Sequence, residues 1–382
     1  MRAPVSTEPA AELNLTITDA APAAASSDPP AKNQATTAAA YSVTVADLHA
    51  DREQVLALWR DNPLQPRDAA SKYRWFYLDN PYGASTQLFL HCGAQEAPVG
   101  VAGMVTRRFL ARGVELSAGQ LTDLFVQPGH RTLYPALLLQ RRMRAIGLGI
   151  HDLLYAYPND TSRQIVQRIG YTEIGSLAKF VVLLRYGEFL ERWLPRWLAR
   201  SVGSVVDATL PLWFRPHRLL LGSWRADWIE SVDARFDSFW ERAKQFDGII
   251  GVRDARFLAW RFLARPDRRY RLFVLTQGGG AIAAYAVCEA VDQTLHIRDM
   301  LFDPKSIEQL RVLIYLLTRQ ALNQNFVRLS FECLANDRLR GLLRAAGMFE
   351  RGMTPLVASL DTEVAASLRG QDWYVTAADT EL

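Results

Sequence analysis

The segment 123–136 joins an apolar, strand-like run to a helix through a loop that holds an arginine. The run Leu121 to Val126 ends at Pro128-Gly129, Arg131 follows, and helical spacing begins at Tyr134. A loop that enters a helix points unbonded backbone N–H groups at one place, and the helix dipole adds partial positive charge there. With the charge of Arg131 beside it, this loop is suited to bind an anionic group such as a pyrophosphate.

The elements that must position this loop alternate between strand and helix. Period-two alternation predicts a strand from Tyr41, and helical spacing predicts a helix over 51–60. Further strands are predicted at 88–90, 99–105, 121–126 and 152–157, and further helices at 134–146 and 161–169, with Gly147 and Gly149 as helix stop signals. This order indicates an α/β or α+β fold.

Four anchors recur in the same order in the two halves of the chain, which predicts an internal duplication. They are Trp75 to Pro81 and Trp260 to Pro266, then Phe89 and Phe273, then Asp123 to Pro128 and Asp299 to Pro304, and last Asn159 to Gly170 and Asn336 to Gly347. We therefore predict two copies of one domain, at 41–180 and 225–360. Residues 1–40 contain no aromatic residue, and their composition predicts a disordered tail. We expect a basic, Trp-rich connecting segment at 181–224 and an acidic tail at 361–382.

The body of the chain is basic. Residues 41–360 hold 41 basic and 31 acidic side chains, a net charge of +10, and 39 of the 44 basic residues in the whole chain are Arg. Because Arg binds phosphate and carboxylate in a bidentate way, an anionic ligand is one explanation; a genome that favours Arg codons is the other.

Composition also excludes several classes of protein. A hydrophobic content of 49% supports a folded core. The three cysteines lie far apart and form no ligand spacing, so we expect no metal and a reducing compartment. With no run of 18 apolar residues and no signal-peptide pattern, we expect a cytoplasmic protein, with the 181–224 segment as a possible peripheral contact with an anionic membrane. A linker that packs against the two domains is the alternative interpretation of that segment.

The repeated anchors resemble the GNAT superfamily of acyltransferases, which take an acyl group from coenzyme A. The resemblance rests on Leu124-Phe-Val-Gln-Pro-Gly-His-Arg-Thr-Leu-Tyr-Pro-Ala136 and on Asn159 with Gly170-Tyr171 eleven residues later. It implies two tandem domains, each with a mixed, mainly antiparallel central sheet flanked by helices. Double-length relatives include the Fem-type transferases, and the segment from Trp75 to Gly83 is similar to acetyltransferase-like proteins of polysaccharide synthesis.

The resemblance also implies roles for individual residues. Asp123 is the candidate base, and a structural partner of an Arg is the alternative role. The usual Tyr position is Val166 here, so the candidate acids are Tyr134, Tyr157, Tyr171 or solvent. Trp75 and Tyr82 are the substrate-binding candidates. The candidates for binding acetyl-CoA or another acyl-CoA are Leu124, Phe125, Val126, Arg131, Thr132, Leu133, Ala136 and Asn159.

The sequence departs from the family pattern in the coenzyme loop. Tyr134 stands where the family has its first Gly, and Pro135 removes one N–H donor. The second copy, after Pro304, retains no such loop, so we expect one working copy and one structural or acceptor-binding copy.

We therefore expect an acyl-CoA-dependent N-acetyltransferase whose acceptor is an amine, such as an amino sugar or a precursor of the cell envelope or of a polysaccharide. One alternative is a Fem-type aminoacyl transferase that uses charged tRNA. Another is a catalytically degenerate GNAT fold that binds at the membrane surface. Seven arginines around Trp260, from Arg253 to Arg271, either bind a nucleic acid, a nucleotide-sugar or an anionic polymer, or form a solvated helix face and its turn.

Overall fold

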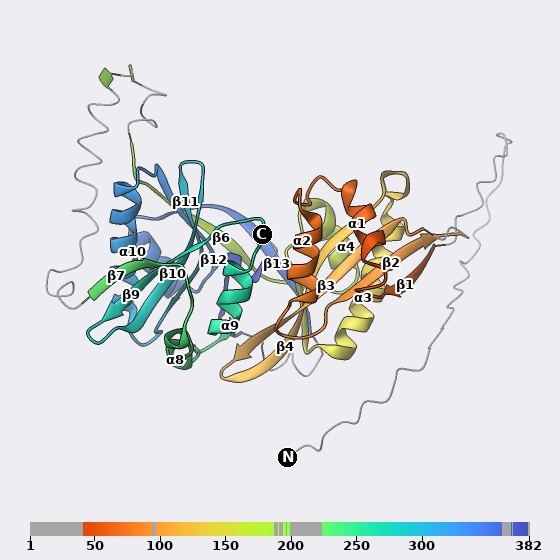
Figure 1. Cartoon of the computed structure of the whole chain (residues 1–382), viewed down its shortest axis with the longest axis horizontal. Coiled ribbons are helices and arrows are strands. Elements are labelled where there is room, and N and C mark those ends of the chain that lie inside the picture. The colour runs from red at the N-terminus through yellow and green to blue at the C-terminus, as the bar shows by residue number, and fades with distance from the viewer. Residues whose placement is uncertain are drawn as a thin grey trace, which may run out of the picture. The chain divides into compact units, whose positions relative to one another are not determined.

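The described residues of this computed structural model are 41–93, 97–186, 190, 194–195, 197–198, 224–360, 368 and 370–380 (Figure 1). The predicted disordered tail at 1–40, most of the predicted connecting segment at 181–224 and about half of the predicted acidic tail lie outside the described residues.

The first copy alternates strands and helices as predicted. Its elements are β1 (Tyr41–Ala46), α1 (Arg52–Arg60), α2 (Ala69–Tyr73), η1 (Arg74–Leu78), β2 (Thr86–Cys92), β3 (Gly100–Ala111), β4 (Val114–Val126), η2 (Pro128–His130), α3 (Leu133–Ile150), β5 (Leu153–Ala156), α4 (Asp160–Arg168) and β6 (Thr172–Leu183).

Helix α3 continues past Gly147 and Gly149, where we predicted its end. Gly147 is required for close packing: a Cβ atom at this position would lie 2.8 Å from Leu154 Cδ1 and 2.9 Å from Met104 Sδ. A glycine that looks like a stop signal in the sequence therefore brings α3 against β3 and β5.

The second copy repeats this order of elements with three changes: a short strand, β8, is inserted between its first two helices, no counterpart of η2 is present among the described residues, and two elements follow its last long strand. Its elements are β7 (Trp224–Ile229), α8 (Ala234–Ala243), β8 (Ile249–Gly251), α9 (Ala255–Leu258), η3 (Ala259–Leu263), β9 (Arg271–Gln277), β10 (Ala281–Val291), β11 (Thr294–Phe302), α10 (Ile307–Asn323), β12 (Arg328–Leu334), α11 (Asp337–Ala345), β13 (Phe349–Leu360), β14 (Trp373–Thr376) and η4 (Ala377–Asp379). The last two lie in the segment that we interpreted as an acidic tail, and β14 is a buried strand.

The repeated Asn-to-Gly spacing marks one capped helix in each copy. Asn159 Oδ1 accepts a hydrogen bond from Ser162 N (2.9 Å) at the start of α4, and Asn336 Oδ1 accepts one from Leu339 N (3.0 Å) at the start of α11. Gly170 and Gly347, just beyond the two helices, have φ of 91° and 76°. Counted from the N-cap asparagine, the eleven-residue spacing thus covers a nine-residue helix, one C-cap residue and the left-handed glycine.

The strands of both copies form one mixed sheet, in which the copies exchange their last long strands. The order is β1-β2-β3-β4-β5-β13-β6-β12-β11-β10-β9-β7. Strand β13 of the second copy pairs with β5 of the first, and β6 of the first copy pairs with β12 of the second. Each copy therefore needs the other to complete its sheet.

Trp75 and Trp260 join the two copies in a reciprocal way. Trp75 Nε1 donates to Trp260 O (2.7 Å), Trp260 Nε1 donates to Trp75 O (2.9 Å), and the rings stack with centroids 5.7 Å apart. Both residues lie in π-helical turns, η1 and η3, at equivalent places. The same contact made from both sides is typical of a local two-fold relation.

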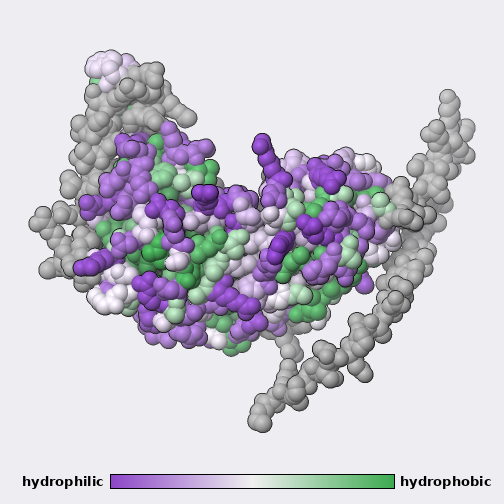
Figure 2. Space-filling model, in the orientation of Figure 1, coloured by the Kyte–Doolittle hydropathy of each residue, from purple (hydrophilic) through white to green (hydrophobic). Residues whose placement is uncertain are grey.

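Helices pack on the sheet in both copies, α3 against β1 to β5 and α10 against β9 to β12. The largest hydrophobic core cluster extends over both copies, and a second cluster lies under α3. On the face drawn in Figure 2, hydrophilic residues cover most of the surface and hydrophobic areas lie between them. Among the described residues, no helix combines the length and apolar character needed to cross a membrane.

Candidate active site

A cleft opens in the first copy where β4 and β5 separate. The two strands pair in parallel only from Ala118 with Leu153 to Gln120 with Tyr155. Beyond these pairs lies a cavity of about 490 Å³, which we call the β4–β5 cleft. Its lining residues are Asn62, Leu64, Gln65, Pro66, Lys72, Leu121, Thr122, Asp123, Leu124, Gln140, Ala156, Tyr157, Pro158, Asn159, Ser162, Val166, Arg265, Asp267 and Arg268.

A β-bulge in β4 coincides with the opening of this cleft. Val101 pairs with Phe125 and Gly103 pairs with Thr122, so Asp123 and Leu124 together face a single residue of β3. Asp123 has a φ of 49°, a left-handed conformation that Asp tolerates better than most residues. Bulges bend a strand and redirect its side chains, and strained backbone clusters at functional sites.

The carboxylate of Asp123 is held by three side chains on one side of β4. Gln65 Nε2 (2.6 Å) and Lys72 Nζ (2.8 Å) donate to Oδ1, and the Tyr77 hydroxyl donates to Oδ2 (2.6 Å). Lys72 Nζ also donates to Gln65 Oε1 (2.8 Å) and lies 5.0 Å from the centroid of the Trp59 ring. The Asp123 side chain is 1% exposed, so these partners replace the water that a carboxylate otherwise needs.

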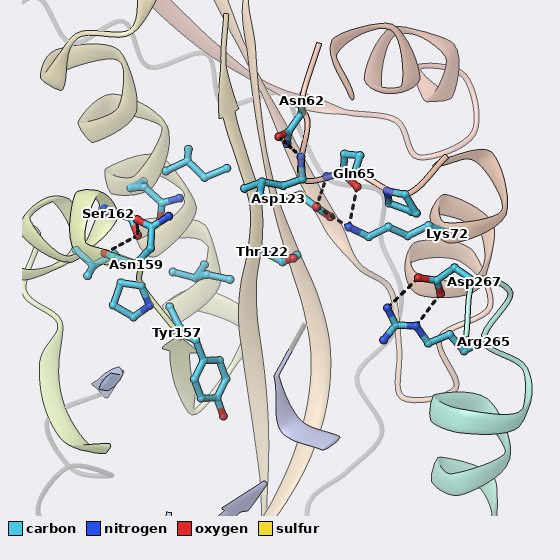
Figure 3. Close-up of a pocket in the computed structure, with 18 of the residues that line it drawn as sticks. Asn62, Gln65, Lys72, Thr122, Asp123, Tyr157, Asn159, Ser162, Arg265 and Asp267 are labelled. Carbon is cyan, nitrogen blue, oxygen red and sulfur yellow. Dashed lines mark hydrogen bonds and ion pairs between the residues drawn. The ribbon is translucent and has the colours of Figure 1, made fainter. Parts of the chain in front are cut away.

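The β4–β5 cleft has two sides, which Figure 3 separates clearly. Asp123, Gln65 and Lys72 lie on one side of β4, whereas Asn159 and Ser162 lie on the other, at the start of α4. The unbonded N–H groups of the first turn of α4 are thus next to the cleft. Val166, where the family has its usual acid, lines the cleft and is buried.

The predicted coenzyme loop lies outside the lining of the cleft. Arg131 folds back on its own loop: its Nε donates to Val126 O (2.8 Å), and its guanidinium carbon lies 5.2 Å from the centroid of the Phe125 ring. Thr132 is the N-cap of α3 but makes no side-chain cap bond, and Pro135 lies in the first turn. Tyr134 is 58% exposed and packs near Tyr41.

The structure therefore brings Asp123, Leu124 and Asn159 together and places the other candidates elsewhere. Phe125, Val126 and Ala136 are buried in the core, and Leu133 and Thr132 are exposed at the start of α3. The two substrate-binding candidates, Trp75 and Tyr82, are buried at the junction of the copies, where the Tyr82 hydroxyl donates to Asp254 Oδ1 (2.9 Å). Neither residue lines the cleft.

Our reading of the sequence missed Lys72, Gln65 and Tyr77 as partners of Asp123. One signal was available for Lys72, which is one of only 5 lysines beside 39 arginines. Arg265 and Arg268 belong to the arginine stretch around Trp260. Its interpretation as a solvated face and turn is wrong for Arg253, Arg261 and Arg265, which are buried.

The equivalent place in the second copy is filled by the end of the described chain. Strands β11 and β12 pair in parallel as far as Ile297 with Phe331. Beyond that point β14 pairs with β12, and the Tyr374 hydroxyl donates to Met300 O on β11. The cavity at this place measures only about 70 Å³.

Asp299, the counterpart of Asp123, is also enclosed. Arg253 Nε donates to Asp299 Oδ1 (3.2 Å), and the Thr376 hydroxyl donates to the same oxygen (2.7 Å). Arg253 also pairs with both carboxylate oxygens of Asp379. All three charged side chains are 0% exposed, and Asp299, unlike Asp123, is not among the residues that line the cavity of its copy.

Several solved structures with a similar fold are described as acyltransferases or probable acyltransferases. The chain matches a probable N-acyltransferase from Enterococcus faecalis with a TM-score of 0.63 at 11% identity, over 87% of this chain and 75% of that one. It matches N-myristoyltransferase from Saccharomyces cerevisiae, solved with bound myristoyl-CoA, with a TM-score of 0.52 at 14% identity, over 87% and 80% of the two chains.

A third similar structure is a tandem GNAT protein from the clavulanic acid biosynthesis pathway. Its TM-score is 0.50 at 13% identity, over 84% of this chain and 98% of that one. No protein-family model and no curated protein matches the sequence. The fold is that of the tandem GNAT proteins, as the repeated anchors predicted.

Proposed function

We propose that this chain is an acyl-CoA-dependent N-acyltransferase that works in its first copy and transfers an acetyl group to an amine. The observation that carries this proposal is the β4–β5 cleft, which places a buried carboxylate where two parallel strands diverge. The acyltransferase fold supports the donor class, and the two-sided cleft supports entry of donor and acceptor from opposite sides of β4.

The described residues fit an acyl-CoA at the diverging strands better than at the coenzyme loop. An extended pantetheine arm suits the strand edges at Leu124 and Ala156, which border the cleft. At the start of α3, Arg131 and the unbonded first-turn N–H groups are exposed and can hold phosphate, although Pro135 reduces their number. When bound, acyl-CoA supplies the thioester carbonyl that an amine attacks.

Asp123 is the candidate to accept the proton of the acceptor amine. Of the two acidic residues that line the cleft, Asp267 is held by Arg265, whereas Asp123 lies at the bulge itself. Its bonds to Lys72 and Tyr77 fix the carboxylate in one orientation. A fixed base of this kind contributes about 10²–10⁴-fold to rate.

No tyrosine is assigned here to protonate the leaving thiolate. Tyr134 lies outside the cleft, and burial raises the pKa of Tyr171, which packs in the core under α3. Tyr157 lines the cleft, but in Figure 3 its hydroxyl points away from Asn159 and Ser162, and burial raises its pKa well above the ordinary value. We assign this proton to water at the open end of the cleft.

Binding of acetyl-CoA tests the donor. We expect the full chain to bind acetyl-CoA in calorimetry and to unfold at a higher temperature in its presence. Arg131→Ala should weaken binding, while Lys305→Ala, at the corresponding loop of the second copy, should not. No binding at millimolar acetyl-CoA contradicts the proposal.

Release of free thiol from acetyl-CoA in the presence of amines then tests transfer. The acceptor as an amino sugar or as a precursor of a polysaccharide or of the cell envelope remains a prediction, and a panel of such amines belongs in this assay. Myristoyl-CoA should be included as a donor, because the similar yeast structure contains it.

A further inference from the structure

We infer that the amine acceptor carries an acidic group, a carboxylate or a phosphate, which is recognised by arginines of the second copy at the β4–β5 cleft. This inference rests on the proposed function and names the class of its acceptor. Arg265 and Arg268 lie in the loop between η3 and β9 and line the cleft of the first copy. In Figure 3, Arg265 and Asp267 lie on the same side of β4 as Lys72 and Asp123, which is the proposed acceptor side.

Arg265 is fixed in place and still has an unused donor. Its Nε and Nη2 donate to the two oxygens of Asp267 (2.7 and 3.1 Å), and its guanidinium carbon lies 5.0 Å from the centroid of the Trp75 ring. Nη1 is buried and has no hydrogen-bond partner, and the residue as a whole is only 7% exposed. A buried guanidinium N–H without a partner costs free energy, which a ligand oxygen can recover.

Arg268 shares its carboxylate partner with another arginine. Its Nη1 donates to both oxygens of Glu289 (3.1 and 3.2 Å), while Arg298 Nε donates to Glu289 Oε2 (2.6 Å). One carboxylate therefore serves two guanidinium groups. The Arg268 side chain is 31% exposed and has donors left for a ligand.

The charges of the cleft do not balance. Its lining contains Lys72, Arg265 and Arg268 against Asp123 and Asp267, an excess of one positive charge. Although burial alone would raise it, the hydrogen bonds from Arg265 hold the pKa of Asp267 below its ordinary value. Asp267 is thus held mainly by Arg265, with Arg268 Nε 3.8 Å from its Oδ2, and the remaining excess of one positive charge favours an anionic ligand.

Two matched pairs of amines test this inference without acyl-CoA. They are glucosamine 6-phosphate with glucosamine, for phosphate, and phenylalanine with phenylalaninamide, for carboxylate. Calorimetry on the full chain should show that the anionic member of at least one pair binds about tenfold more tightly or better. The pair that shows the preference identifies the acidic group.

Variants of Arg268 connect any preference to this site. Arg268→Gln leaves the Arg298–Glu289 pair intact and should bring the ratio within a pair close to one. Arg268→Lys should keep part of the preference, because it keeps the charge and loses the planar fork. The control is Arg344→Gln, an exposed arginine whose partner Glu350 also pairs with Arg340.

The inference is overturned if the wild-type chain prefers neither anionic member, including the case in which no amine binds at millimolar concentration, or if Arg268→Gln keeps the preference. Failure of acetyl-CoA binding in the separate experiment overturns the proposed function and leaves this anion site standing. Acetyl-CoA binding without a preference for anionic amines overturns this inference and leaves the proposed function standing.

Discussion

The two copies carry an aspartate at matching positions of matching strands but surround it differently. In the first copy the β-bulge contains Asp123 itself, with its left-handed backbone, next to a cavity of about 490 Å³. In the second copy the bulge falls at Arg298, Asp299 stays paired with Val287, and β14 fills the gap between β11 and β12. The first carboxylate borders a cavity, whereas the second is enclosed by Arg253 and Thr376.

This difference teaches that a retained acidic residue does not by itself mark an active copy. In each copy of this fold, the parallel pairing of two strands stops after a few residues, which leaves room for a ligand or for another segment of the chain. Here β14 and η4 fill one gap, and their contacts extend to the other copy, since Arg107 Nη2 of the first copy donates to Ala378 O. Arg261 Nε of the second copy donates to the same oxygen. The second copy therefore stabilises the fold and supplies Arg265 and Arg268 to the cleft of the first.

The largest expected effect separates the two aspartates by activity. Asp123→Asn should lower the rate of acetyl transfer by about 10²–10⁴-fold, because the amide cannot accept a proton. Asn tolerates the left-handed backbone at this position, so the strand should keep its bulge. Asp299→Asn should leave the rate per folded molecule within a few-fold of wild type. Equal rate losses in the two variants, measured as thiol release, would mean that Asp123 has no special role.

The next effect concerns stability, and it tests the buried ion pairs that enclose Asp299 in the second copy. Arg253→Ala leaves Asp299 buried without its cation and Asp379 with only Arg107 Nη2, 3.6 Å from Oδ1, which should cost about 3–5 kcal/mol in the free energy of unfolding. Chemical denaturation measures this cost, and Arg344→Ala at an exposed pair should change the free energy by about 0.5 kcal/mol or less. A similarly small cost for Arg253→Ala would show that the filled second copy does not depend on this ion pair.

A third effect concerns two histidines in similar surroundings. His151 Nδ1 is hydrogen bonded to Ser117 Oγ (2.7 Å) in the first copy, and His296 Nδ1 to Ser330 Oγ (2.8 Å) in the second. Burial lowers the pKa of both, and together with the positive charge of Arg298 it lowers that of His296 to about 4. The folded chain thus resists protonation of His296 more strongly.

The sign of the resulting pH dependence follows from the depressed pKa. Between about pH 6.5 and pH 4 the unfolded chain binds the proton and the folded chain does not, so stability falls as the pH falls through this window. We expect His296→Gln to remove about 1–2 kcal/mol of this loss after allowance for partial exposure, and His151→Gln to remove less. Urea unfolding at pH 7 and pH 5 measures the difference, and the reverse ranking would contradict it.

The sequence predicted the duplicated fold well because its anchors are local. The spacing from Asn159 to Gly170 is one capped helix, and such a helix looks the same wherever it packs. Most of the cleft could not be predicted, because Lys72, Arg265 and Arg268 reach it from elements that only the strand exchange and the Trp75–Trp260 contact bring together. Nor could the filling by β14 be predicted, since an acidic composition at 361–382 concealed the buried run Trp373–Thr376.

The smallest expected effect compares the two helix caps. Asn159→Ala and Asn336→Ala each remove a side-chain acceptor from the first turn of a helix, so each should lower the free energy of unfolding by about 1 kcal/mol. Only Asn159 borders the open cleft, and we expect only Asn159→Ala to weaken acetyl-CoA binding, by about threefold to tenfold. Calorimetry on both variants, at matched folded fractions, measures this difference. Equal affinity in the two variants would mean that Asn159 only caps α4 and that the first turn of this helix takes no part in holding the donor.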